Sequence, residues 1–131
     1  MNTKTYDCGL RLIHEENDTI AAAVVKIYCL VGGRDEDDSN RGIAHLLEHM
    51  FFKGTKTRNA HQINSTFDKL GVMINAFTDF DRTCFHAQGL TEHLSTIFDV
   101  MSDCLYNSVF DAKELAKEKT VVCSELEMYE N

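Results

Sequence analysis

The feature that most constrains this chain is the segment Gly42–Phe52, which reads Gly-Ile-Ala-His-Leu-Leu-Glu-His-Met-Phe-Phe. His45 and His49 are four residues apart, so on a helix their imidazoles share one face and can hold a single cation. Glu48 lies about 100° before His49 on the helix, where its carboxylate can reach a ligand of that cation and act as a general base. The other side chains are apolar, which predicts a buried helix whose polar stripe needs partners.

Two imidazoles do not complete a catalytic zinc site, which takes three protein ligands and leaves one position for water. The missing ligand can come from the acidic segment near the C-terminus. Its candidates, among which spacing alone does not choose, are Glu114, Glu118, Glu125, Glu127 and the thiolate of Cys123. Mixed ligation of this kind suits hydrolysis, because the cation lowers the pKa of water and polarises a carbonyl. Glu48 would then take a proton and pass it to the leaving amine.

Length and charge restrict the class of protein. The 131 residues, 44% hydrophobic and 26% charged, suffice for one globular domain with a single core. The net charge of -8 argues against nucleic-acid binding, which needs a cationic surface. No apolar run approaches the roughly 20 residues of a membrane span, so no membrane partner is expected. Five cysteines without a C-x-x-C pair, and a start without a signal core, predict reduced thiols and a cytoplasmic location.

The order of predicted elements is ββααββαα, which indicates an α+β domain with helices packed on one face of a mainly antiparallel sheet. Alternation and turn residues predict two hairpins, formed by residues 10–15 with 20–31 and by residues 72–77 with 83–88, and the strand at 20–31 is expected to be central. Besides the helix at 42–52, helices are predicted at 59–71, 91–106 and 111–129. The acids of the loop at 34–40 precede a helix N-terminus, where the helix dipole favours negative charge.

The motif also carries a family resemblance. His45-Leu-Leu-Glu48-His49 is the inverted H-x-x-E-H zinc motif of the inverzincins. The surrounding residues 41–55 resemble the M16 family of metallopeptidases, which includes pitrilysin, insulin-degrading enzyme and the mitochondrial processing peptidase. Residues 70–78 resemble the edge strand of that family, and residues 114–127 resemble its downstream acidic helix. The resemblance covers essentially the whole chain.

The resemblance implies a zinc-dependent endopeptidase acting on extended or unfolded peptides. By this resemblance His45, His49 and Glu125 would bind Zn²⁺, and Glu48 would be the general base. Glu118 would be an acid that orients one of the ligands. The edge strand that binds the peptide would consist of Asn75, Ala76, Phe77 and Thr78. The peptide substrate would add to this edge as a further strand.

Members of the family usually have two related halves, each of two such domains, which close around the substrate. Residues 1–131 are therefore expected to be a single, incomplete N-terminal zinc-binding domain. Such a chain is expected to pair with a second half or with another copy of itself. The alternative function is a catalytically weak or inactive zinc-binding module that works through interactions, because an incomplete domain leaves apolar surface uncovered.

Overall fold

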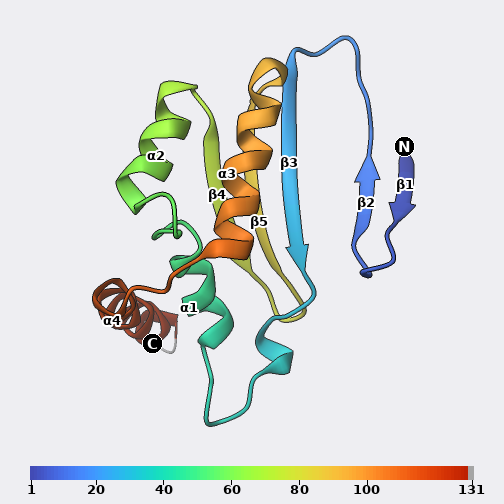
Figure 1. Cartoon of the computed structure of the whole chain (residues 1–131). Helices are drawn as coiled ribbons and strands as arrows, with labels where there is room; N and C mark the ends of the chain where they lie inside the picture. The colour runs from blue at the N-terminus through green and yellow to red at the C-terminus, as the bar shows by residue number, and fades with distance from the viewer. Residues whose placement is uncertain (130–131) are drawn as a thin grey trace.

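The computed structural model describes residues 1–129, which form a three-stranded sheet, a separate hairpin and four α-helices (Figure 1). The sheet order is β3 (Ala22–Cys29), β5 (Thr83–Leu90) and β4 (Met73–Thr78), with both pairs antiparallel. The hairpin consists of β1 (Asn2–Thr5) and β2 (Arg11–His14). The helices are α1 (Ile43–Met50), α2 (Ala60–Lys69), α3 (Leu94–Asn107) and α4 (Ala112–Tyr129), and two 3-10 turns are η1 (Gly33–Asp35) and η2 (Thr91–His93). The α+β class with an antiparallel sheet is as predicted.

The predicted pairing of the first two strands is wrong. β2 pairs with β1, a strand without an apolar face that the pattern did not indicate, and β3 pairs with β5. β5 is therefore the central strand of the sheet, and β3 lies at its edge. Alternation predicts where strands occur but not their partners. Here the eight residues of β3 match the eight of β5 in a register that buries Val25 beside Ala87.

The core lies between the sheet and helices α1, α2 and α3, and Figure 1 shows α3 lying over the sheet with its axis roughly along the strands. One contact is a stack of the Phe51 ring on the Phe85 ring, with centroids 3.7 Å apart. On the opposite face, Val24, Tyr28 and Met73 are exposed. This arrangement confirms helices on one face of the sheet. The main buried residues are Val25, Ile63, Phe67, Phe85, Ala87, Ile97, Val100 and Met101.

Two predicted helix starts have different outcomes. Asn59, the first residue of the helix predicted at 59–71, caps α2: its side chain accepts from the N–H of Gln62, and the Gln62 side chain accepts from the N–H of Asn59. Thr91 does not cap α3, which begins at Leu94 after η2 and has no side-chain cap. The residue that opens α4 is Asp111, whose carboxylate accepts from the N–H groups of Lys113 and Glu114.

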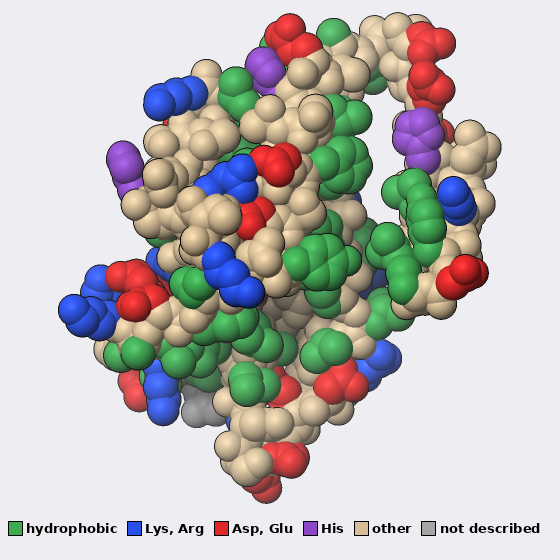
Figure 2. Space-filling model, viewed as in Figure 1, with side chains coloured by type: hydrophobic (Ala, Val, Ile, Leu, Met, Phe, Trp, Pro, Cys, Tyr) green, Lys and Arg blue, Asp and Glu red, His purple; other side chains and the backbone are tan. Residues whose placement is uncertain are grey.

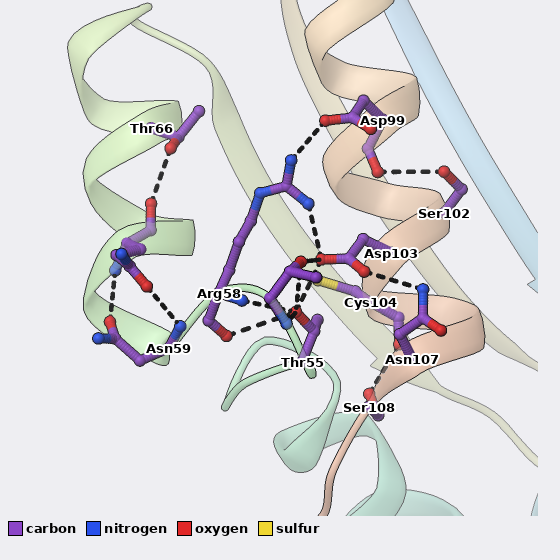
Figure 3. A network of polar contacts seen from close by, with 12 residues as sticks. Thr55, Arg58, Asn59, Thr66, Asp99, Ser102, Asp103, Cys104, Asn107 and Ser108 are labelled. Atoms are coloured by element: carbon purple, nitrogen blue, oxygen red, sulfur yellow. Dashed lines mark hydrogen bonds and ion pairs between the residues drawn. The ribbon is translucent and has the colours of Figure 1, made fainter.

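A buried polar network fixes the segment between α1 and α2 to α3 (Figure 3). The carboxylate of Asp103 accepts from the Thr55 hydroxyl at 2.7 Å, the Thr57 hydroxyl at 2.9 Å and the Arg58 guanidinium at 2.6 Å. These bonds, foremost that from Thr55, outweigh the opposing effect of burial and hold the pKa of Asp103 well below its usual range. The segment that leaves α1 is therefore held in one position.

Apolar side chains are exposed on the N-terminal hairpin. Figure 2 shows hydrophobic groups gathered there, and Leu10, Leu12 and Ile13 are among the exposed residues. Within residues 1–129, no helix combines the length and the hydropathy that crossing a bilayer requires.

Candidate metal centre

Helix α1 begins where the sequence motif begins, because the backbone there is capped. Gly42 precedes the helix with φ of +86°, a left-handed conformation that favours glycine. The Glu36 carboxylate accepts from the N–H of Gly42 at 2.7 Å and the N–H of Ala44 at 2.8 Å. These bonds satisfy donors that a helix N-terminus leaves unpaired. Among the acids of the loop at 34–40, Glu36 is therefore the one that binds the N-terminus of α1, where the helix dipole favours negative charge.

The polar stripe of α1 faces α4. Nε2 of His45 lies 3.1 Å from Nε2 of His49, and Oε2 of Glu125 lies 3.4 Å from the first and 3.5 Å from the second. The three side chains come from two helices, with Glu125 lying 76 positions after His49 in the chain, and all three are half-buried. The fold therefore assembles the three predicted ligands into one cluster.

The cluster fits a zinc ion. Ligand atoms about 2.0–2.1 Å from a tetrahedral zinc lie about 3.3 Å from one another, close to the three observed separations. Nδ1 of His49 lies 3.0 Å from the Glu118 carboxylate, an acceptor, so the neutral imidazole that binds a metal would carry its proton on Nδ1 and its lone pair on Nε2, the atom nearest the other two donor atoms. Three electron-pair donors in such close contact favour a cation between them.

Glu118 lies behind His49 and does not join the three donor atoms. Its Oε2 is 3.0 Å from Nδ1 of His49, and its Oε1 is 2.6 Å from Nζ of Lys53. Burial acts to raise the pKa of Glu118, but the hydrogen bonds and charges of Lys53 and His49 outweigh it, so the pKa is lowered. The ionised carboxylate is the form that accepts the Nδ1 proton, as outer partners of metal-binding histidines do.

Glu48 lies beside the cluster in a cleft of about 490 Å³. Its Oε2 accepts from the hydroxyl of Thr78, the last residue of β4, at 2.5 Å. His45, Ala76, Phe77 and Leu126 also line this cleft, so it joins the start of α1 to the edge of the sheet and to α4. A group bound in this cleft would contact both Glu48 and the edge of β4.

β4 is an edge strand, as predicted, because it pairs with β5 on one side only in the described residues. Asp79 N–H donates to Arg82 C=O at 2.8 Å, and bonded and non-bonded pairs alternate along an antiparallel ladder. The pairs Thr78↔Thr83 and Ala76↔Phe85 are then non-bonded, so the backbone groups of Thr78 and Ala76 point outward. Accordingly, the N–H of Ala76 donates to its neighbour's side chain, Oδ1 of Asn75, at 2.9 Å. Asn75 and Phe77 direct their own backbone groups to β5.

The structure also separates the candidates that spacing left open. Glu114 accepts from Lys117 on its own helix, and Cys123 is exposed, so neither belongs to the cluster. Two contacts were not predicted: Lys53 with Glu118, and the Thr78 hydroxyl with Glu48. The first had a signal in the sequence, since Lys53 continues the four-residue spacing of His45 and His49. The second depends on the packing of β4 against α1 and has no local signal.

Comparisons with known proteins agree on one family. The family model described as Insulinase (Peptidase family M16) matches residues 11–131. The uncharacterized zinc protease YmxG of Bacillus subtilis is 43% identical over 130 residues, which are 98% of this chain and 32% of that protein. The mitochondrial-processing peptidase subunit beta of Rattus norvegicus is 32% identical over 93% of this chain and 25% of that protein.

A solved protease has a similar fold. The crystal structure of a protease from Helicobacter pylori superposes with a TM-score of 0.89 and 26% sequence identity, covering 95% of this chain and 30% of that one. The chain therefore spans about a third or less of the length of these relatives.

Proposed function

The chain belongs to the M16 family of zinc proteases, and from that premise we propose that it carries the zinc-binding site of an endopeptidase that cleaves extended peptides. The observation that supports this most is a cluster of three ligand side chains, His45, His49 and Glu125, beside a cleft. His45, Glu48 and the open edge of β4 line that cleft. In this proposal residues 1–131 are one domain of a longer protease built of two halves. The share of each relative that the chain covers supports this.

His45, His49 and Glu125 would hold the zinc ion. Zinc, when bound, supplies a Lewis acid that activates water and polarises the carbonyl to be cleaved. Glu48 acts as the base: the Thr78 hydroxyl occupies its Oε2, which leaves Oε1 free to take the proton of the attacking water. The same carboxyl then delivers the proton to the nitrogen of the leaving amine. Glu118 takes no proton in this scheme and keeps His49 oriented.

The peptide would bind as a strand added to β4. The outward backbone groups of Ala76 and Thr78 can pair with an extended peptide. Thr78 also contacts Glu48, so a peptide paired here lies next to the base. The Asn75 side chain must release the N–H of Ala76 when the peptide binds. Main-chain pairing of this kind accepts many sequences, which suits unfolded substrates.

The test replaces Glu48 by glutamine, which keeps the size of the side chain but cannot act as a carboxylate base. We expect Glu48→Gln to bind zinc like the parent and to cleave an unstructured, fluorescence-quenched peptide at least about 100-fold more slowly. The matched control is Glu114→Gln, an acid on α4 that contacts Lys117 and not the cluster. A Glu48→Gln protein as active as the parent would refute the role of Glu48.

The exposed apolar residues of the hairpin and of the open sheet face favour a second candidate, a zinc-binding module of low activity that works through association. Leu12 and Ile13 on β2 and Val24 on β3 are such residues. Light scattering combined with the peptide assay separates the two candidates. A monomeric 131-residue chain that cleaves peptide would remove the second, and an associated chain that binds zinc without cleaving would support it.

A further inference from the structure

Lys53 forms an ion pair with Glu118, but the mechanism proposed above gives Lys53 no role. It follows α1 in the turn where its N–H donates to the C=O of Met50 at 3.1 Å. Its Nζ lies 2.6 Å from Oε1 of Glu118, and both side chains are mostly shielded, with exposed fractions of 32% and 13%. Within residues 1–129, Lys53 is the one lysine or arginine at ion-pair distance from an acid of the site.

Two stripes of polar residues face each other across α1 and α4. His45, His49 and Lys53 follow one another at intervals of four along the first segment, and Glu118 and Glu125 are seven apart on the second. Glu125 meets both imidazoles, while Glu118 meets His49 and Lys53. The contacts therefore run from Glu125 and the two imidazoles through Glu118 to Lys53.

The two oxygens of Glu118 have different partners. Oε1 is bound by Lys53 and Oε2 by His49, so the plane of the carboxylate is fixed at both ends. A carboxylate held by one partner can rotate or present either oxygen, and it then sets the imidazole orientation less sharply. Lys53 is itself held in place, because Asp103 and its partners anchor the segment from Thr55 to Arg58 that follows it.

We propose that Lys53 is a positioning residue of the metal centre: it locks the Glu118 carboxylate so that His49 keeps its proton on Nδ1 and presents Nε2 to the metal. This inference rests on the proposed function for the identity of the metal. The contacts themselves are independent of whether the chain cleaves peptides. Lys53 touches neither a ligand atom nor the cleft, so its effect passes through Glu118.

The first experiment measures zinc affinity by competition with a chromogenic chelator. We expect Lys53→Met, which keeps the aliphatic chain and removes the ammonium, to raise the Kd for zinc about 10-fold. This is the low end of the cost of losing an outer partner of a ligand histidine, because Lys53 acts one contact further out, through Glu118. Lys53→Arg keeps the charge and donors and is expected to recover most of the affinity. The matched control is Lys117→Met, which removes a lysine–glutamate pair one residue before Glu118. A Kd within about twofold of the parent in Lys53→Met would overturn the proposal.

The second experiment reads the imidazole directly in the zinc-free chain. Long-range ¹⁵N–¹H NMR distinguishes a proton on Nδ1 from one on Nε2, and circular dichroism verifies that each variant is folded. The parent is expected to show His49 with its proton on Nδ1, and Lys53→Met to show both tautomers. Lys53→Gln serves if Lys53→Met fails to fold. An unchanged tautomer in the folded variant contradicts the proposal.

A double-mutant cycle identifies the route of the effect. In a Glu118→Gln background, Lys53→Met should change the zinc Kd by less than about twofold, because the group through which Lys53 acts has lost its charge. Equal effects in both backgrounds would show that Lys53 acts independently of Glu118 and would overturn the proposal. If the parent bound no zinc, the proposed metal centre would fail, while the tautomer comparison would still decide the role of Lys53.

Discussion

The hydroxyl of Thr78 donates to Oε2 of Glu48 at 2.5 Å, which ties the last residue of the edge strand to the carboxylate on α1. The two residues are 30 positions apart in the chain. The strand on which a peptide would pair and the group that would move the proton are thus fixed relative to each other. Pairing of a peptide with Thr78 would place it beside the base without a further movement of α1.

Loss of the Thr78 hydroxyl should slow the chemical step. We expect Thr78→Val, which has the same shape, to lower kcat about 10-fold with little change in KM, because the backbone groups that pair with peptide remain. Thr78→Ser keeps the hydroxyl and should retain most of kcat. Steady-state kinetics with the quenched peptide measure both constants, and an equal loss in the two variants would assign the effect to packing.

Removal of Glu125 should remove the metal. Glu125→Ala leaves two histidines, which do not complete a zinc site, so we expect its zinc content after loading and dialysis to fall below about 0.2 equivalents. Glu114→Ala, on the same helix but outside the cluster, should retain the parent content. Metal analysis of the purified chains is the measurement. Parent-like zinc in Glu125→Ala would exclude Glu125 as a ligand.

Blocking the edge of β4 should weaken peptide binding without unfolding the sheet. The N–H of Ala76 points outward, so Ala76→Pro removes a donor that makes no bond to β5. We expect KM to rise about 10-fold or more, with a nearly unchanged melting temperature. Phe77→Pro is the contrasting variant, because residue 77 pairs with Cys84 and loses a bond of the ladder. A parent-like KM in Ala76→Pro would argue against strand addition at this edge.

The Asp103 network should make the free energy of unfolding decrease as the pH falls into the acid range. Asp103→Ala leaves the donors of Thr55 and Arg58 unpaired, and we expect a loss of about 2–4 kcal/mol in the free energy of unfolding at pH 7. The pKa of Asp103 is lowered in the folded state. Its contribution is therefore fully present above the unfolded pKa of about 3.9 and is lost as the pH falls through the folded pKa.

Urea unfolding at pH 7 and pH 3 checks this dependence, and the difference between parent and Asp103→Ala should be smaller at pH 3. Asp99→Ala removes the exposed partner of the same Arg58 and is expected to cost less than about 1 kcal/mol. A difference of the same size at both pH values would show that the ionised form of Asp103 is not what stabilises the network.

Much of the local structure follows from the sequence because its causes are local. The four-residue spacing of His45 and His49 places both imidazoles on one face only if the segment is a helix, and the structure has a helix at Ile43–Met50. Asn59 and Gln62 form a capping box, and alternation on either side of residues 79–82 forms the hairpin of β4 and β5. Each of these signals lies within a few residues of its effect.

Which distant groups meet depends on how the helices and strands pack. Spacing left Glu114, Glu118, Glu125, Glu127 and Cys123 open as partners of the histidines, and the packing of α4 on α1 brings Glu125 to both imidazoles and Glu118 to Nδ1 of His49. The same holds for the pairing of β3 with β5, which sequence periodicity does not encode. The spacing of His45, Glu48 and His49 is enough to predict that two histidines and a glutamate share one helix. The contacts that complete the candidate metal centre depend on side chains about 70 residues away, whose approach is set by the burial of a common core.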